Sequence, residues 1–195
     1  MINFDEENHI YTVFGKPVPS VTQILKEVFP NKYSGIPPEI LEKKAEYGKQ
    51  VHKYIEIIEK KKPKKPLAYI KRYYNPDMYQ EESIKQYLKI KEENKIKVLA
   101  SEKMVLYGLY YCGTLDMLAN VNGKRAIIDI KTTAELDELY VSYQNSLYEM
   151  ANGKVDKLYC LWLPKGHIGK LVEVNRIDNN LLKIIIGEIE WKVYL

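Results

Sequence analysis

Cysteine is scarce in this chain of 195 residues, which holds two, Cys112 and Cys160. Two thiols cannot supply the four thiolates of a Cys₄ zinc site or of an iron–sulfur cluster, so these sites are excluded. Each cysteine lies in an apolar run typical of a strand. We therefore expect two buried free thiols in a reducing compartment.

Long apolar runs are also missing, because no stretch approaches the roughly 18–20 residues that cross a bilayer. The first residues, MINFDEEN, are acidic and polar, so we expect no signal peptide, no membrane partner and a cytoplasmic protein. Hydrophobic residues make up 46% of the chain, which suits one compact domain. The net charge of +4 permits a partner with a phosphate backbone but does not require one.

Helix caps and prolines divide the first half of the chain into predicted elements. Ser20 and Gln23 form a capping box, which predicts that a short helix begins at the next residue after Ser20. The prolines of Lys60–Pro66 break any helix, so this lysine-rich segment is predicted to be a loop. The expected elements are a small hairpin over 2–17, helices from Val21, over about 38–61 and over 77–95.

The second half is predicted to place strands and helices around a hairpin. Thr132 and Glu135 fit another capping box, and Gly153 fits the residue after a helix end. This order is typical of an α/β core, so we expect one domain with an N-terminal helical lobe at 1–95 and the core at 96–195. The expected elements are a strand at 97–108, a hairpin at 110–131, a helix at 135–152, strands in KLYCLWL and KLVEVNR, and a helix at 178–192.

The segment GTLDMLANVNGKRAIIDIKTT is a predicted hairpin that carries charges inside apolar strands. Its Asn-Gly pair is a strong signal for a two-residue turn, and counting outward from that turn places Asp116 opposite Asp129. The same count places Thr114 opposite Lys131. Because side chains alternate along a strand, two carboxylates and an ammonium gather on one face. The other face is expected to be core, made of Leu115, Met117, Ala119, Val121, Ala126, Ile128 and Ile130.

Two carboxylates that face each other across paired strands repel, so a neutralising group is expected beside them. A divalent cation with oxygen ligands is the natural candidate, and the hairpin favours such a site. An Asp-x-Lys sequence by itself is a weak signal, for which a surface ion pair is the simpler interpretation.

A second group of residues shares one face of the predicted helix at 38–61. Gly48, His52 and Glu56 are spaced four apart, and a glycine within a helix suits a close approach by another segment. For a lone histidine, a surface or core position without function is the simpler interpretation.

Two further positions suit a site only in combination with the others. Gln144 and Tyr148 share a face of the predicted helix at 135–152, where packing is the simpler interpretation. Glu102 precedes the hairpin, where an exposed strand position is the simpler interpretation.

Together these residues resemble the RecB-like branch of the PD-(D/E)XK nuclease superfamily. That branch carries G-x-x-x-H-x-x-x-E on a helix, an acid before the core hairpin, G-x-x-D, D-x-K and Q-x-x-x-Y, and all occur in this chain in that order. The segment YTVFGKPVPSVTQIL is also similar to small exonucleases of phages and of the mitochondrial genome maintenance type. The resemblance covers roughly residues 9–165, and its matching positions are Gly48, His52, Glu56, Glu102, Gly113, Asp116, Asp129, Lys131, Gln144 and Tyr148.

The resemblance implies a restriction-endonuclease-like fold, with a central mixed sheet flanked by helices. It implies a metal-dependent DNA exonuclease of recombination or repair, encoded by a bacterium or a phage. The implied cofactor is Mg²⁺ or Mn²⁺, with no iron–sulfur cluster, since the cluster cysteines of some relatives are absent. The implied partners are DNA, as single strands or ends, and a single-strand annealing or recombination protein.

The resemblance also implies a role for each matching residue. Asp116, Asp129, Lys131 and Glu102 are the implied catalytic residues, with Lys131 orienting the attacking water. The implied metal ligands are His52, Asp116, Asp129 and the backbone carbonyl of Ile130. The expected DNA contacts are Gln144, Tyr148, Ser20 and Lys49, with bracing of the metal ligands left open for Gln144 and Tyr148.

Two other functions remain open. One is a structure-selective DNA endonuclease on the same core, against which the His52 and Gln144 motifs argue. The other is a DNA-binding accessory protein without activity, against which the intact set of Asp116, Asp129 and Lys131 argues.

Overall fold

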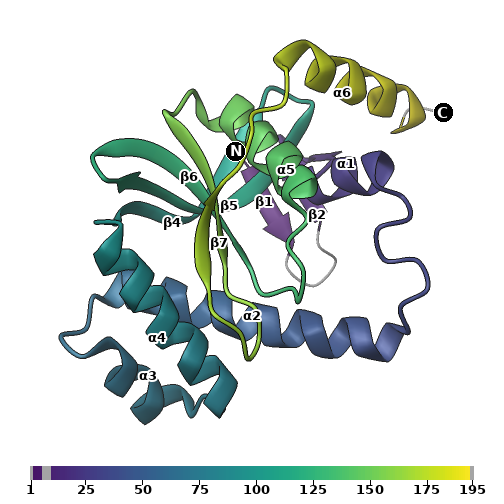
Figure 1. The fold of residues 1–195 in the computed structure, drawn as a ribbon. Helices are drawn as coiled ribbons and strands as arrows, with labels where there is room; N and C mark the ends of the chain where they lie inside the picture. Colours follow the sequence, from purple (N-terminus) through teal and green to yellow (C-terminus); the bar gives the residue numbers. More distant parts are fainter. Residues whose placement is uncertain (1, 6–9, 194–195) are drawn as a thin grey trace.

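A five-stranded sheet lies between two layers of helices in the computed structural model, which describes residues 2–5 and 10–193 (Figure 1). The strand order is β4-β5-β6-β7-β8, and every neighbouring pair is antiparallel except β6 and β7, which run parallel. The sheet is therefore mixed, and the expected α/β class is confirmed. The strands are β4 (Lys97–Tyr107), β5 (Tyr111–Val121), β6 (Lys124–Lys131), β7 (Lys157–Trp162) and β8 (Lys170–Glu173).

One face of the sheet is covered by α2 (Pro38–Lys61), α3 (Pro66–Tyr74) and α4 (Met78–Glu93). Buried residues of these helices form one hydrophobic cluster with β5, β6 and β7. These three helices of the N-terminal half therefore share a core with the sheet. The long helix α2 crosses the molecule below the sheet in Figure 1, so residues of its middle reach the strand ends.

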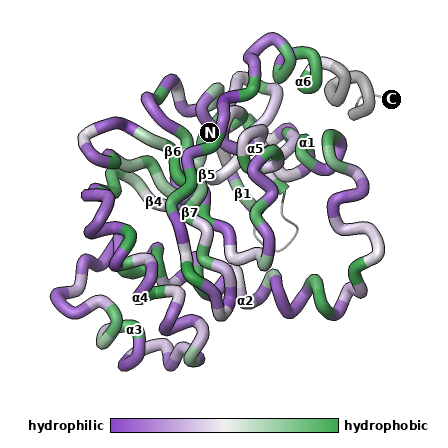
Figure 2. The backbone as a smooth tube through the Cα atoms, viewed as in Figure 1, coloured by the Kyte–Doolittle hydropathy of each residue, from purple (hydrophilic) through white to green (hydrophobic). Residues whose placement is uncertain are grey.

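The opposite face is covered by α1 (Val21–Val28), α5 (Glu138–Asn152) and α6 (Asn179–Val193). These helices form a second hydrophobic cluster with the strands. Hydrophobic residues follow the central strands in Figure 2, whereas the outer helices alternate between hydrophobic and hydrophilic positions. This pattern is expected of a sheet buried on both faces under amphipathic helices.

A second, three-stranded sheet stands at the start of the chain, where a single hairpin is expected over 2–17. It consists of β1 (Ile2–Asp5), β2 (Ile10–Val13) and β3 (Lys16–Val18), while residues 6–9 lie outside the described part. Phe14 and Gly15 both have positive φ, which closes the second hairpin between β2 and β3. The prediction missed this turn because Phe14 has no sequence preference for it.

Most of the other predicted elements are confirmed. The capping box of Ser20 and Gln23 begins α1, α2 spans the expected residues, and Gly153 ends α5. The capping box of Thr132 and Glu135 is wrong, because Asp137 caps α5 by accepting the Tyr140 N–H. Helix α3 was not expected. No helix in the described residues is long and apolar enough to cross a membrane.

A buried charged cluster joins α2 to α4. The Tyr87 hydroxyl donates to Glu59 Oε1 at 2.6 Å, and the Lys91 ammonium pairs with the same oxygen. Both Glu59 and Tyr87 are buried. A buried carboxylate is costly unless its hydrogen bonds are made, so this cluster fixes how the two helices pack.

We predict that Tyr87→Phe lowers the free energy of unfolding by about 1–3 kcal/mol, because it removes a donor from a buried carboxylate. Urea denaturation measures this loss. Tyr73→Phe is the matched control, since Tyr73 is 59% exposed on α3. Equal stabilities for the two variants would show that the Tyr87 hydrogen bond contributes nothing.

Candidate metal centre

The β5–β6 hairpin keeps the predicted register only as far as Met117 and Ile128. Asp116 and Asp129 would form the next pair, but the ladder has ended there. The Oδ2 atom of Asp116 instead accepts the N–H of Ile130 at 2.6 Å. The expected direct opposition of the two aspartates is therefore replaced by a bond from a side chain to the neighbouring backbone.

The alternation of side chains slips at the same point of β5. Leu115 belongs to the hydrophobic cluster on the α5 side, whereas Met117 belongs to the cluster on the α2 side. The prediction that these two residues share one face is therefore wrong. In a regular strand, the side chains of residues i and i+2 point to the same face. Because those of Leu115 and Met117 do not, the strand is distorted at Asp116.

The neighbouring strand β4 is distorted at the facing position. Glu102 has φ of 50° and lies between two regular pairs, Ser101 with Met117 and Lys103 with Leu115. A glutamate in this left-handed conformation is unusual and costs energy, and such residues cluster at functional sites.

Three ligand-type side chains meet at these distortions. One ligand atom each from His52, Glu102 and Asp116 lies within 4.8 Å of the other two. They come from α2, β4 and β5. Gly48 makes the approach of α2 possible, since a Cβ atom there would lie 3.0 Å from Oγ1 of Thr132. The close approach expected for this glycine is confirmed.

The hydrogen bonds of His52 suit a metal ligand. Its Nε2 atom lies 3.0 Å from the carbonyl oxygen of Ile130, so this nitrogen carries a proton and donates. The other nitrogen, Nδ1, faces Oδ1 of Asp116 at 3.5 Å. Histidines that bind metals are typically held in this way, with the second ring nitrogen donating to a carbonyl. The Ile130 carbonyl, which the resemblance implies as a ligand, accepts this hydrogen bond and so orients His52.

The charges of the cluster are unevenly compensated. Burial, reinforced by the neighbouring Asp116 carboxylate, raises the pKa of Glu102 to about 7. Burial also acts to raise the pKa of Asp116, but His52, Lys131 and the Ile130 N–H outweigh it and hold that pKa below its ordinary value. Repulsion between the carboxylates therefore raises the pKa of Glu102, whereas the pKa of Asp116 stays low. A bound cation would offset this repulsion at Glu102.

Asp129 and Lys131 lie beside this cluster on β6. The Lys131 ammonium is 2.7 Å from Oδ2 of Asp129 and donates to Oε1 of Gln144 at 2.9 Å. Asp129 is 1% exposed, and its Oδ2 accepts no well-aligned hydrogen bond from the described residues. Burial raises the pKa of Asp129 to about 6 although Lys131 opposes this. Asp129 thus adjoins the three side chains that could hold a metal ion, and its own role as a ligand stays a prediction.

Gln144 and Tyr148 brace this arrangement from α5. The Gln144 amide donates to the Tyr148 hydroxyl at 3.4 Å, and Tyr148 is 5% exposed. Gly113 leaves room for the Tyr148 ring, because a Cβ atom at this position would lie only 3.0 Å from it. Of the two roles left open by the sequence, this burial favours bracing over DNA contact for Tyr148.

The remaining predicted site residues do not belong to the group of His52, Glu102 and Asp116. The hydroxyl of Ser20 accepts the Gln23 N–H at 3.1 Å and is buried, so it caps its own helix. Lys49 is exposed on α2 one turn before His52. Glu56 pairs with Lys53 and Lys60 of its own helix.

Tyr11 is a residue near the site that the sequence did not indicate. Its hydroxyl lies 3.1 Å from Oγ1 of Thr114, and the side chain is buried. It links the small N-terminal sheet to β5. Alternation along β2 predicts that Tyr11 is buried, but nothing in the sequence predicts which strand it meets.

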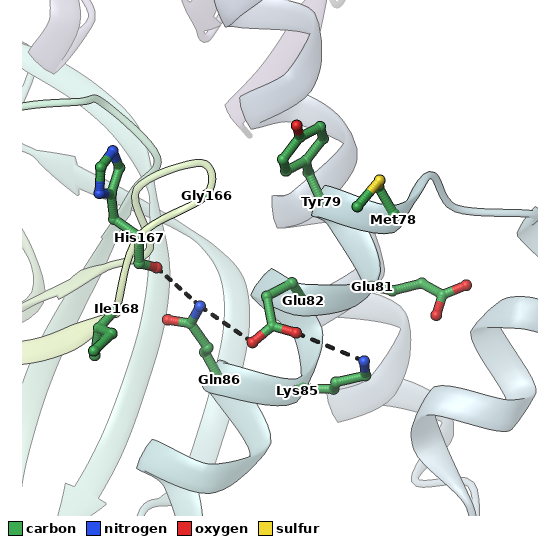
Figure 3. Close-up of a pocket in the computed structure, with 9 residues that line it drawn as sticks. All are labelled: Met78, Tyr79, Glu81, Glu82, Lys85, Gln86, Gly166, His167 and Ile168. Carbon is green, nitrogen blue, oxygen red and sulfur yellow. Dashed lines mark hydrogen bonds and ion pairs between the residues drawn. The ribbon is translucent and has the colours of Figure 1, made fainter.

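A hollow of about 510 Å³ lies elsewhere, between α4 and residues 166–168 (Figure 3). Its lining includes none of His52, Glu102 and Asp116. Its loop is held to α4 by Gln86, whose amide donates to the carbonyl oxygen of His167 at 2.9 Å.

Comparison with known proteins leaves the family open. No family model matches this chain, and no curated protein matches it. A solved structure described as "Crystal structure of SSO0001" is similar over 85% of this chain and 82% of that chain, with 16% identity and a TM-score of 0.38. A likeness this distant carries no argument about function.

We predict opposite effects of neutralising Glu102 and Asp116 on the metal-free protein. Since the folded-state pKa of Glu102 is raised from 4.5 to about 7, its contribution to stability is present at low pH and is lost between these values as pH rises. Glu102→Gln should therefore raise the melting temperature at pH 8 more than at pH 5. Asp116→Asn should lower it at both pH values, because the lowered pKa of Asp116 reports a stabilised carboxylate.

Thermal unfolding with a chelator present measures both effects. A Glu102→Gln variant whose gain is the same at pH 5 and pH 8 would contradict this distribution of charge between Glu102 and Asp116.

Proposed function

We propose that this protein is a metal-dependent DNA exonuclease with a restriction-endonuclease-like core. The observation that carries the proposal is the convergence of residues far apart in sequence. His52, Glu102 and Asp116 meet within 4.8 Å of one another. The pair of Asp129 and Lys131 adjoins them on β6. A structural ion pair alone would require neither a third carboxylate nor a left-handed glutamate.

Mg²⁺ or Mn²⁺ would be held by the ligating atoms of His52, Glu102 and Asp116. The two carboxylates would supply the oxygen ligands that suit these cations, and the imidazole would add one nitrogen ligand. A divalent ion in such a site binds a phosphate oxygen and lowers the pKa of a coordinated water. The Ile130 backbone holds two of these side chains in place. Its N–H donates to the Asp116 carboxylate, and its C=O accepts a hydrogen bond from His52.

Lys131 is the residue proposed to act on the reacting phosphate. Its ammonium is held by Asp129 and Gln144. Burial acts to lower the pKa of Lys131, but the carboxylates of Asp129 and Asp116 outweigh it and raise that pKa, so the ammonium stays charged at neutral pH. A fixed positive charge can stabilise the negative charge that develops on the phosphate oxygens during hydrolysis. Asp129 orients Lys131 in this scheme.

We predict that millimolar Mg²⁺ or Mn²⁺ raises the melting temperature and supports degradation of linear DNA, while closed circles are spared. Binding to the folded state alone gives the thermal shift. Asp116→Asn should abolish both effects. End-labelled linear DNA and covalently closed plasmid are digested in parallel, with EDTA as the blank.

Two results would change this assignment. Rapid nicking of closed plasmid would favour an endonuclease on the same core. A thermal shift without any cleavage would favour a DNA-binding accessory protein.

Lys131→Ala should reduce turnover on the order of 10²-fold or more, because a transition-state donor is removed. Lys124→Ala, an exposed lysine at the turn of the same hairpin, is the control and should keep full activity. DNA affinity in EDTA should change little for either variant. The double variant Asp129→Asn/Lys131→Ala tests the fold, since it leaves no unpaired buried carboxylate. Full activity of Lys131→Ala would remove Lys131 from the mechanism.

A further inference from the structure

A second hollow, of about 280 Å³, lies where the end of α1 and the following loop meet the start of α5. This volume is at the small end for a ligand pocket and suits a single planar ring system. We refer to it as the α1–α5 pocket. Its lining residues are Leu25, Lys26, Phe29, Pro30, Lys32, Tyr33, Ser34 and Tyr140.

Aromatic rings form much of the wall. The Phe29 ring centre lies 5.3 Å from that of Tyr140 and 5.4 Å from that of Tyr143, so Phe29 and Tyr140 are fixed by packing. Tyr33 is different, because it is 48% exposed at the rim. An exposed ring beside fixed rings offers a face on which a flat ligand can stack.

Two lysines, Lys26 and Lys32, also line the pocket. The Lys32 ammonium lies 4.1 Å from the centre of the Tyr140 ring and 5.8 Å from that of Tyr33. It is held there by an ion pair with Asp137, the N-cap of α5. Lys26 adds a second, exposed cation. Aromatic rings beside one held ammonium and one exposed ammonium suit a ligand that has both a flat face and a negative charge.

The pocket also adjoins the proposed catalytic centre. The Lys131 ammonium lies 6.0 Å from the centre of the Tyr140 ring, so one aromatic ring separates it from the pocket. A phosphate beside Lys131 would therefore bring the base of a neighbouring nucleotide within reach of the pocket.

We propose that the α1–α5 pocket receives one unpaired nucleobase of the strand being degraded, stacked on Tyr33. This inference rests on the proposed function and names its substrate as a single strand or an unpaired end. A base inside a duplex is stacked on both faces, so it cannot present a face to Tyr33 without leaving the helix.

The test measures binding of short single-stranded oligonucleotides in EDTA, where no cleavage occurs, by fluorescence anisotropy. One set carries all its bases, and a matched set carries abasic sites instead. Tyr33→Ala should weaken binding of the first set on the order of tenfold, because base stacking on an aromatic ring is lost. Tyr33→Phe keeps the ring and should bind as the wild type does.

The control is Tyr79→Ala, which removes a tyrosine of similar exposure, 41%, from the hollow beside residues 166–168 (Figure 3). It should leave affinity unchanged. Abasic oligonucleotides should bind the wild type more weakly, and Tyr33→Ala should weaken them no further, as expected when the ring and the base form one interaction.

The outcomes separate this inference from the proposed function. Cleavage of linear DNA together with binding that is indifferent to Tyr33 would overturn the pocket and leave the nuclease. Binding that depends on both Tyr33 and the bases, without any cleavage, would overturn the nuclease and leave the pocket. Equal losses for Tyr33→Ala and Tyr79→Ala, or for intact and abasic strands, would overturn the pocket.

Discussion

The bond between the Asp116 carboxylate and the Ile130 N–H is the interaction on which the site depends. It stands where the ladder between β5 and β6 has ended, so a side chain satisfies a backbone donor that lies inside the protein. The same residue that binds Asp116 through its N–H binds His52 through its C=O. One residue of β6 therefore sets the positions of two proposed ligands from two different elements.

The charged groups of the site form two pairs, held by helices on opposite sides of the sheet. His52 approaches from α2 beside Asp116, while Lys131 turns toward α5 beside Asp129. Asp116 lies beside the His52 ring and Asp129 beside the Lys131 ammonium, whereas Glu102 is the carboxylate that burial penalises most clearly toward neutral pH. A buried carboxylate without a compensating charge makes the metal-free protein modestly less stable. A divalent cation bound beside it would remove this cost, so binding would stabilise the folded protein.

Two small residues allow the helices to reach the strands. The absence of a side chain at Gly48 lets Thr132 pack directly on α2. The absence of one at Gly113 lets Tyr148 of α5 pack directly on β5. Larger side chains at either position would push a helix away from the sheet and separate the proposed ligands from their supports. The glycines of the two motifs are therefore explained by contact distances.

The sequence by itself determined the α/β class, the caps of α1, the extent of α2 and the turn of the hairpin, because these depend on nearby residues. It also brought His52, Asp116, Asp129 and Lys131 together as candidates. Only the tertiary structure decided that the ladder ends before Asp116, that Leu115 changes face and that Glu102 lies together with His52 and Asp116. These outcomes depend on how α2 and β4 pack against the hairpin, which no local pattern specifies.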